Sequence, residues 1–222
     1  MKATFTPVYG PASILEIRDA PLQDLGEHDV RVQVEASPVT AGDRRLRSAD
    51  FPGISAVPGR LMMGVFRPRR AIQGTMFAGR ISAVGEAVTR YKVGDDVFGA
   101  AEGGAYAEYL SMAEDGPMAL IPEGMGYDEA AAVPYGAGTS LHFLCDVAKL
   151  QRGERLLVLG ASGGVGRYAI QLAKHLGATV TAVCSPADAP LVRELGADEV
   201  IDYHLTDFTE TSERYDVIFD IA

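Results

Sequence analysis

The chain has 222 residues, 47% of them hydrophobic, and a formal net charge of −10. That charge argues against a nucleic-acid partner, because phosphate binding needs a clustered positive surface. No apolar run is long enough to cross a bilayer and no cleavable signal sequence follows Met1, so we expect a cytoplasmic protein without membrane association. Cys145 and Cys184 are expected to be reduced packing residues, with a redox role as the alternative.

The N-terminal half contains short β-rich runs separated by turn residues. The runs cover residues 3–8, 30–35, 76–84, 93–98 and 105–110. Turns such as Tyr9-Gly10-Pro11 and Gly94-Asp95 punctuate them, as they do in compact all-β structures. We therefore expect a barrel-like β domain here. An Ala-rich stretch with helical spacing follows at residues 128–150, and it is expected to join this domain to a second one, with the active-site cleft between the two.

Residues 153–174 read as a buried strand, a glycine-rich turn and an amphipathic helix. The apolar run 156–159 suits a parallel strand, and Gly160 ends it with a residue that is free to take a positive φ. A backbone so poor in side chains can approach a dinucleotide, and the first amides of the helix face its phosphates. The expected cofactor-binding residues are Gly160, Ser162, Gly163, Gly164, Val165 and Gly166.

A glycine-rich turn alone can also serve ordinary strand-to-helix packing. The succession that follows favours the nucleotide interpretation: an apolar strand at 179–183, a helix at 191–195, a short strand at Val200 and Ile201, and another strand at 216–220. This order is the first half of a doubly wound parallel sheet.

Several sequence motifs resemble one known family. GASGGVG (160–166), QLAKHLGA (171–178), LGADEVIDY (195–203) and YDVIFD (215–220) resemble the zinc-independent, zeta-crystallin-like quinone oxidoreductase branch of the medium-chain dehydrogenase/reductase superfamily. GTMFAGRISAVG (74–85), YKVGDDVFG (91–99), GGAYAEYL (103–110) and the stretch 121–144 extend the resemblance over the whole chain. It implies an α/β protein with a GroES-like catalytic domain at 1–122 and the first part of a Rossmann domain at 123–222. The full-length family form is expected to be a homodimer.

The resemblance also predicts whether the protein binds zinc and which residues act on the substrate. The resemblance puts the first ligand cysteine of the superfamily's zinc enzymes at Thr40, their His-Glu pair at Thr75 and Met76, and their third ligand in the region of Tyr135. None of these residues is a cysteine or histidine, so no zinc is expected. A zinc-free site must polarise a carbonyl with hydrogen-bond donors while a nicotinamide delivers hydride. The resemblance implies that Thr40 and Asp43, in the family's Asn-x-x-Asp segment, and Tyr135 supply the protein's share. Thr40 departs from the usual Asn, and Asp43 could equally cap a loop or helix.

Cofactor choice is expected at the end of the second strand of the Rossmann domain. NAD-specific sites place an acidic residue there, whereas this chain has Ser185, which leaves room for a 2′-phosphate. Tyr203 resembles the family tyrosine that closes this pocket. NADPH is therefore favoured, with NADH as the alternative, since Asp188 lies near enough in sequence to act as the ribose acid. Thr139 is expected on the nicotinamide side, or as an N-cap for residues 140–144.

These features predict an NADPH-dependent oxidoreductase that reduces a quinone or an α,β-unsaturated carbonyl. Two alternatives stay open, an alcohol dehydrogenase-like carbonyl reductase and a non-catalytic nucleotide-binding protein. The second arises because the chain stops at Ala222, where the family pattern continues through two more strands. Seven of the sixteen arginines lie between Arg44 and Arg70, either on a solvated loop or beside the substrate cleft, where they would attract an anionic substrate.

Overall fold

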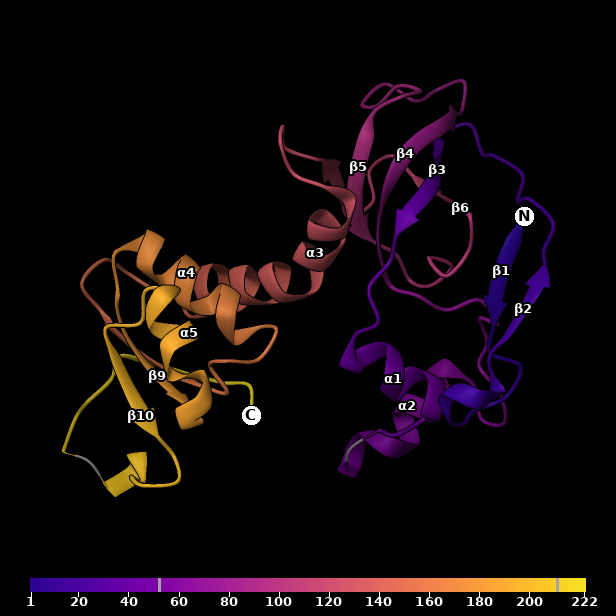
Figure 1. Ribbon diagram of the computed structural model, residues 1–222. Helices are drawn as coiled ribbons and strands as arrows, with labels where there is room; N and C mark the ends of the chain where they lie inside the picture. The colour runs from indigo at the N-terminus through magenta and orange to yellow at the C-terminus, as the bar shows by residue number, and fades with distance from the viewer. Residues whose placement is uncertain (52, 211) are drawn as a thin grey trace. The chain divides into compact units, whose positions relative to one another are not determined.

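The chain forms two compact units, Met1–Ala132 and Val133–Ala222 (Figure 1). The computed structural model describes residues 1–222 except residues 52 and 211, and at residue 55 only the main chain. The division falls within helix α3 (Tyr127–Leu141), whereas the sequence placed the domain boundary before that helix, at 122/123.

The N-terminal unit is built on a five-stranded antiparallel sheet in the order β6-β3-β4-β5-β7. Its strands are β3 (Asp29–Ala36), β4 (Met76–Val84), β5 (Asp96–Ala100), β6 (Tyr109–Ala113) and β7 (Met118–Leu120). Alternate residues of β3 point inward, so Val30 and Val32 are fully buried with Phe77 and Ile81 of β4. A separate hairpin pairs β1 (Lys2–Phe5) with β2 (Glu16–Asp19).

Two helices follow β3 and complete this unit. The helices are α1 (Ala41–Ser48) and α2 (Ala56–Met63), and short 3₁₀ turns lie at Ala12–Ile14 and Gly53–Ser55. Helix α1 ends at Ser48 and is capped by Ala49, which takes the left-handed conformation with φ 52°. The arginine-rich segment noted in the sequence therefore consists of α1, α2 and the loop that leads to β4.

Glu114 ties the loop before β5 to the end of β6, and it makes the stability of this unit depend on pH. The buried carboxylate accepts hydrogen bonds from the backbone amides of Arg90 (2.7 Å) and Thr89 (2.8 Å), and these bonds lower the pKa of Glu114. A lowered folded-state pKa stabilises the fold above the unfolded pKa of about 4.3, and this contribution is lost as pH falls through the folded-state value.

We expect Glu114→Gln to weaken the dependence of the unfolding free energy on pH below about pH 4.3. Urea denaturation between pH 3 and pH 7 measures this. Glu86→Gln, at an exposed glutamate, is the matched control and should keep the parent's acid slope. An unchanged acid slope in Glu114→Gln would contradict this role.

The C-terminal unit is a four-stranded parallel sheet in the order β10-β9-β8-β11. Strand β8 (Arg155–Leu159) is followed by α4 (Gly166–Leu176), β9 (Thr179–Cys184), α5 (Ala189–Glu194), β10 (Glu199–Asp202) and β11 (Val217–Asp220). Leu156 and Val158 are fully buried, and Ile170 and Ala173 of α4 pack against the same core. The order reverses between β8 and β11, and nucleotides bind outside the carboxyl ends of the strands at such a switch point.

The long helix predicted at 128–150 is confirmed as α3, which continues as a π-helical segment over His142–Val147. Cys184 is buried at the end of β9, where desolvation raises the pKa of its thiol, and both cysteines are unbridged. A buried thiol with a raised pKa is a packing residue rather than a reactive one.

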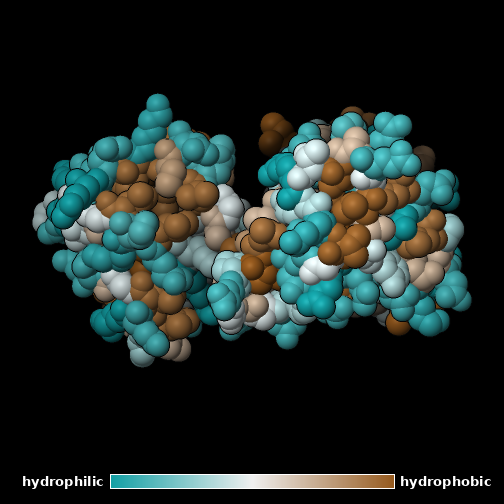
Figure 2. All heavy atoms as spheres, turned by 90° about the horizontal axis from the view of Figure 1, so that it is seen from above, coloured by the Kyte–Doolittle hydropathy of each residue, from teal (hydrophilic) through white to brown (hydrophobic). Residues whose placement is uncertain are grey.

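Apolar side chains reach the surface of both units in patches (Figure 2). Exposed apolar residues of the C-terminal unit include Phe143 and Val147 after α3 and Ile218 in β11. Apolar surface of this kind commonly takes part in further protein contacts. Within the described residues, every helix is too short or too polar to cross a lipid bilayer.

Candidate functional site

The glycine-rich turn after β8 combines a tightly packed side with an open one. Gly160 has φ 73°, and the carbonyl of Gly160 accepts the amide of Gly163 (3.0 Å). A Cβ on Gly166 would lie 2.5 Å from that carbonyl oxygen and 2.6 Å from the carbonyl oxygen of Ala161, so only glycine permits this approach of α4 to β8. Gly166 is therefore required by the packing of the helix on the strand.

The other side of the turn is free to receive a ligand. Gly163 and Gly164 are exposed, and a Cβ on Gly164 would meet nothing within 4 Å. In the described part of the chain, the amides of Gly164 and Val165 have no hydrogen-bond acceptor. They lie directly before the first residue of α4, where the helix dipole is positive. Unpaired amides with this polarity fit a phosphate group.

Asp188 links this turn to the end of β9. One of its carboxylate oxygens accepts hydrogen bonds from the hydroxyls of Ser185 (2.8 Å) and Ser162 (2.9 Å). These bonds lower the pKa of Asp188, and the nearby guanidinium of Arg167 lowers it further, so the carboxylate is ionised at neutral pH. Arg167 itself donates to the carbonyl of Ser162 (2.7 Å). Asp188 thus joins Ser162 and Ser185, two predicted cofactor-binding residues. The sequence had offered Asp188 only as the ribose-binding acid of the NADH alternative.

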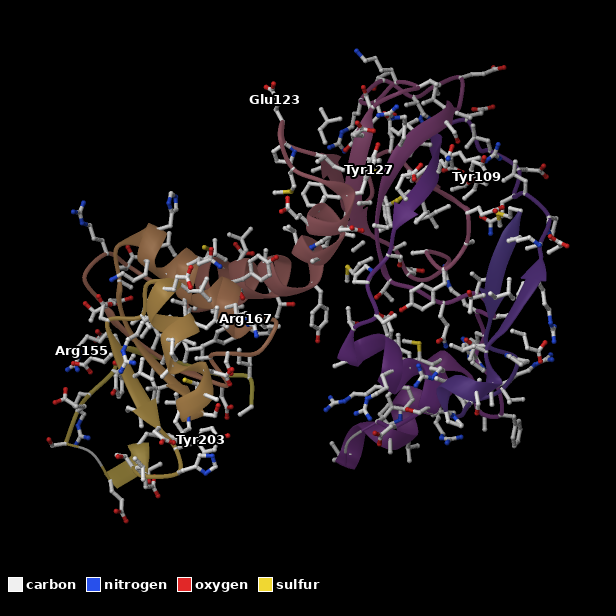
Figure 3. The ribbon with its side chains drawn as sticks, in the orientation of Figure 1. Tyr109, Glu123, Tyr127, Arg155, Arg167 and Tyr203 are labelled. Carbon is white, nitrogen blue, oxygen red and sulfur yellow. The ribbon has the colours of Figure 1, made fainter. Side chains whose placement is uncertain are left out.

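Tyr203 leaves the sheet beside Ser185. The register pairs Asp202 of β10 with Cys184 of β9, so the next residue of each strand emerges at the same carboxyl edge. Tyr203 is exposed there, with its ring centroid 4.3 Å from that of His204 (Figure 3). Gly160, Ser185 and Tyr203 thus follow the carboxyl ends of three neighbouring strands, as an adenosine site of a doubly wound sheet requires.

Helix α3 packs against the glycine-rich turn through a small residue. A Cβ on Gly136 would lie 2.4 Å from the carbonyl oxygen of Gly164, and the buried hydroxyl of Ser140 donates to the carbonyl of Val165 (3.0 Å). Neither Gly136 nor Ser140 was predicted from the sequence. The run of small residues in YGAGTS (135–140) was the available signal for close packing. Thr139 lies inside α3, so its alternative interpretation as an N-cap is wrong, because the helix continues through it. Tyr135 lies on α3 and is exposed.

In the N-terminal unit, Thr40 and Asp43 form a polar cluster at the start of α1. Asp43 is buried and accepts hydrogen bonds from the backbone amide (2.9 Å) and the hydroxyl (2.6 Å) of Thr40, while its own amide donates back to the Thr40 hydroxyl (3.1 Å). This is a capping box, which confirms the helix-cap interpretation of Asp43. Tyr135 belongs to the C-terminal unit, unlike these two residues.

Two further residues complete the cluster, and sequence reasoning gave neither of them a role in it. The hydroxyl of Thr75, just before β4, donates to the other carboxylate oxygen of Asp43 (3.0 Å). Burial raises the pKa of Tyr106, the Asp43 carboxylate raises it further, and the phenol donates to the carbonyl of Pro38 (3.2 Å). The cluster therefore presents hydroxyl groups held by one carboxylate. Among the described side chains, no group of three or more His, Cys, Asp or Glu residues is arranged to hold a metal ion.

Both units match known families. Residues 26–123 match the alcohol dehydrogenase GroES-like domain, and residues 164–222 match the family described as zinc-binding dehydrogenase. A quinone oxidoreductase of Pseudomonas aeruginosa is 38% identical over 197 residues, which cover 88% of this chain and 56% of that protein. An NADPH-dependent alkenal/one oxidoreductase of Arabidopsis thaliana chloroplasts is 32% identical, covering 99% of this chain and 57% of that protein. The chain thus spans little more than half the length of these relatives.

The fold agrees with the sequence matches. The solved structure of the quinone oxidoreductase from Coxiella burnetii superimposes with a TM-score of 0.86 at 28% identity, covering 100% of this chain and 68% of that one. The antiparallel sheet of β3 to β7 lies within the GroES-like match, and β9, β10 and β11 of the parallel sheet lie within the second match. On these grounds the chain belongs to the medium-chain dehydrogenase/reductase superfamily and is quinone oxidoreductase-like within it.

Proposed function

We propose that the protein is an NADPH-dependent oxidoreductase that reduces a quinone or an α,β-unsaturated carbonyl compound by hydride transfer without zinc. The observation that carries this proposal is the open side of the glycine-rich turn, where exposed glycines and unpaired amides precede α4. Such a cradle fits the pyrophosphate of a dinucleotide. The relatives that match over most of the chain carry quinone or alkenal/one oxidoreductase names.

The residues have separate roles in this proposal. The amides of Gly164 and Val165 hold the pyrophosphate, and Ser185 and Tyr203 hold the adenosine end. The reduced nicotinamide supplies the hydride. The hydroxyls of Thr40 and Thr75 already donate to Asp43, so the exposed phenol of Tyr135 is the freest donor to a substrate carbonyl. Asp43 keeps the two threonine hydroxyls oriented, which makes it a positioning residue.

The zinc-free part of the proposal rests on the chemistry of the side chains at the family's ligand positions. Thr40 and Thr75 are not zinc ligands, and both are engaged by Asp43, while Met76 and Tyr135 offer no thiolate or imidazole. A carbonyl must then be polarised by hydrogen bonds alone.

An activity panel tests the function. Purified protein is mixed with NADPH and, in separate reactions, with a quinone, an enone, a saturated ketone and an aldehyde, while the absorbance of the reduced nicotinamide is followed. Oxidation with the quinone or the enone supports the proposal. Reaction only with the ketone and aldehyde would favour the carbonyl reductase alternative, and nucleotide binding without any turnover would favour the non-catalytic one.

Cofactor preference gives a sharper prediction, because Asp188 opposes the proposed role of Ser185. An ionised carboxylate bonded to Ser185 repels a 2′-phosphate and suits the ribose hydroxyls of NADH, the alternative cofactor. We expect Asp188→Asn, which removes the charge, to tighten binding of 2′,5′-ADP about tenfold, as expected for repulsion of about 1 kcal/mol or more at a few ångström. Affinity for 5′-AMP should change less than about twofold.

Titration calorimetry with the two fragments measures this difference. Glu194→Gln removes an equal charge from the exposed end of α5 and should leave both affinities at the parent's values. If Asp188→Asn tightens the binding of 5′-AMP as much as that of 2′,5′-ADP, the carboxylate does not act on the 2′-phosphate.

A further inference from the structure

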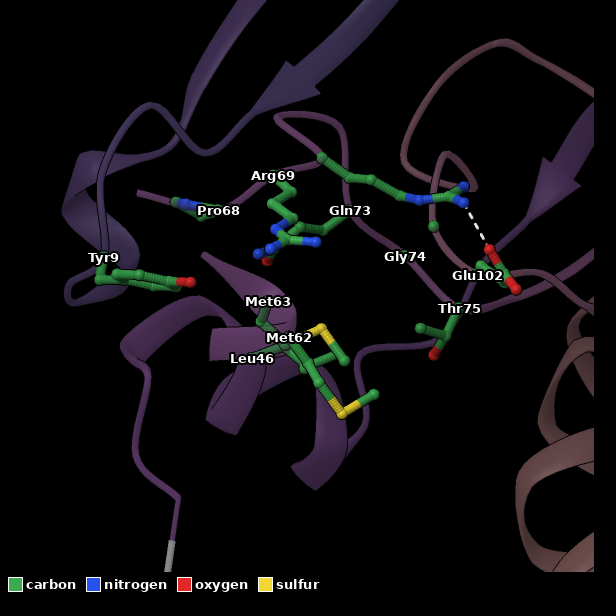
Figure 4. A pocket seen from close by; sticks show the side chains of 12 residues that line it. Tyr9, Leu46, Met62, Met63, Pro68, Arg69, Gln73, Gly74, Thr75 and Glu102 are labelled. Carbon is green, nitrogen blue, oxygen red and sulfur yellow. Dashed lines mark hydrogen bonds and ion pairs between the residues drawn. The ribbon is translucent and has the colours of Figure 1, made fainter. Parts of the chain in front are cut away.

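A cavity of about 540 Å³ lies in the N-terminal unit, beside the Asp43 cluster (Figure 4). Its walls come from segments far apart in the sequence, including α1, α2, the loop before β4 and the loop after β5. All of its lining residues belong to Met1–Ala132, so the cavity is complete within one unit. A volume of this size accommodates a small organic molecule.

The middle of the cavity is apolar and adaptable. Leu46 of α1 and Met62 and Met63 of α2 line it, and both methionines are exposed. Unbranched thioether side chains adjust to ligands of different shape, and exposed methionines are common at surfaces that bind varied apolar groups. This part of the cavity therefore suits an aliphatic or planar apolar segment.

The two ends of the cavity are polar and differ in character. Thr75, which donates to Asp43, lines one end, and Tyr9 lies at the opposite end in Figure 4, with the methionines between them. Tyr9 donates its phenol to the carbonyl of Gly64 (2.7 Å). Its pKa is raised by burial and lowered in part by the positive charges of Arg60 and Arg69, so both guanidinium groups lie near this end.

The positive charge at the Tyr9 end is not neutralised. Arg69 donates to the carbonyl of Leu61 (2.9 Å), and Arg60 to the carbonyl of Val65 (3.1 Å). Among the described residues, no carboxylate forms an ion pair with either of them. Arg70 differs, because it is paired with Glu102. In a chain with a net charge of −10, two unpaired arginines beside an apolar cavity form a local site for an anion.

We propose that this cavity binds substrates in which an apolar segment separates the reactive carbonyl from a carboxylate, with the carboxylate at Arg69 and the apolar segment along Leu46, Met62 and Met63. The proposal deepens the function proposed above, on which it rests for the identity of the reactive group. It assigns the arginine-rich segment a binding role at Arg69 and leaves Arg67, outside the cavity, as a solvated surface residue.

The test compares a keto acid with its ester. The probes are 7-oxooctanoic acid and its methyl ester, which have the same apolar segment and carbonyl and, without a conjugated alkene, do not undergo enone reduction. Calorimetric or NMR titration at pH 7 and low salt should give about fivefold tighter binding of the acid by the parent. Arg69→Gln should bring the two affinities together by weakening the acid only, and Arg69→Lys should retain a preference for the acid.

Two further variants separate this site from the general field of the protein. Arg67→Gln makes the same charge change in the same loop and should keep the fivefold preference. Glu102→Gln should enlarge the preference for the acid, because this variant releases Arg70 from its ion pair at the cavity wall. Equal affinity of the parent for acid and ester, absence of binding by both, or equal losses in Arg67→Gln and Arg69→Gln would overturn the proposal.

The binding measurement and the activity measurement can fail separately. A preference for the acid without any hydride transfer would contradict the oxidoreductase activity and support the anionic site. Turnover of an uncharged quinone or enone by a protein that binds acid and ester equally would support the activity and overturn the site.

Discussion

Gly164→Asp should abolish binding of nicotinamide nucleotides, with an affinity loss of at least about a hundredfold. The new carboxylate would stand at the unpaired amides before α4, where the pyrophosphate is proposed to bind. The negative carboxylate would then repel the negative pyrophosphate, which in the parent meets the positive end of the helix. A loss of this size corresponds to about 2.7 kcal/mol. Fluorescence or calorimetric titration with NADPH measures it.

The fold of this variant should survive, because a Cβ on Gly164 meets nothing within 4 Å. Gly164→Ala is the matched control, because it adds the same Cβ without a charge. It should weaken the binding of NADPH much less than Gly164→Asp does. Circular dichroism of both variants should match the parent. A folded Gly164→Asp protein that binds NADPH as well as the parent would show that the turn does not hold the phosphates.

Gly166→Ala should instead destabilise the C-terminal unit, by about 3 kcal/mol, as expected for forced overpacking. Its Cβ would lie 2.5 Å from the carbonyl oxygen of Gly160 and 2.6 Å from that of Ala161, and both acceptors belong to backbone that cannot move without separating α4 from β8. Urea denaturation followed by far-ultraviolet circular dichroism measures the loss as an earlier transition.

The matched control is Gly138→Ala at an exposed position of α3, where a Cβ meets nothing within 4 Å. Alanine forms helix better than glycine, so this variant should gain about 0.5–1 kcal/mol. Equal unfolding midpoints for the parent and Gly166→Ala would mean that the turn can open to admit a side chain, contrary to the packing described here.

The parallel sheet of the C-terminal unit was predictable because its strands are buried on both faces and read as continuous apolar runs. Runs 156–159 and 179–183 became β8 and β9 with at most one added residue at an end. The N-terminal unit was harder. Strand β4 has the predicted bounds, but β2 is exposed at all four positions and carries no alternation to detect.

The strand predicted at 105–110 illustrates a different difficulty. Ala105 and Ala107 are buried, but the Ala105 amide donates to the carbonyl of Gly74, Ala107 forms only an isolated antiparallel bridge with Ala3 of β1, and β6 begins at Tyr109. Gly103 and Gly104 both have positive φ, which delays the strand. Hydrophobicity alone does not distinguish a buried segment with a single bridge from a continuous strand.

The candidate site was predictable where its residues are close in sequence. The glycine-rich turn and the Thr40-Asp43 pair lie within short motifs whose geometry follows from local rules. The bond between Thr75 and Asp43 joins positions 32 residues apart, and that between Ser162 and Asp188 joins positions 26 apart. Such contacts depend on how the strands are ordered in the sheet, so the role of Asp188 stayed open until the fold was known.

The most direct test of the proposed function follows hydrogen from cofactor to product. The protein is incubated with an enone and with NADPH that carries deuterium at both positions of the nicotinamide C4, and the product is analysed by mass spectrometry. Hydride transfer from the nicotinamide should give a saturated ketone with one deuterium on the carbon that was β to the carbonyl. A saturated product without deuterium, or no reduction of any quinone or enone offered, would contradict hydride transfer from a nicotinamide bound at the glycine-rich turn.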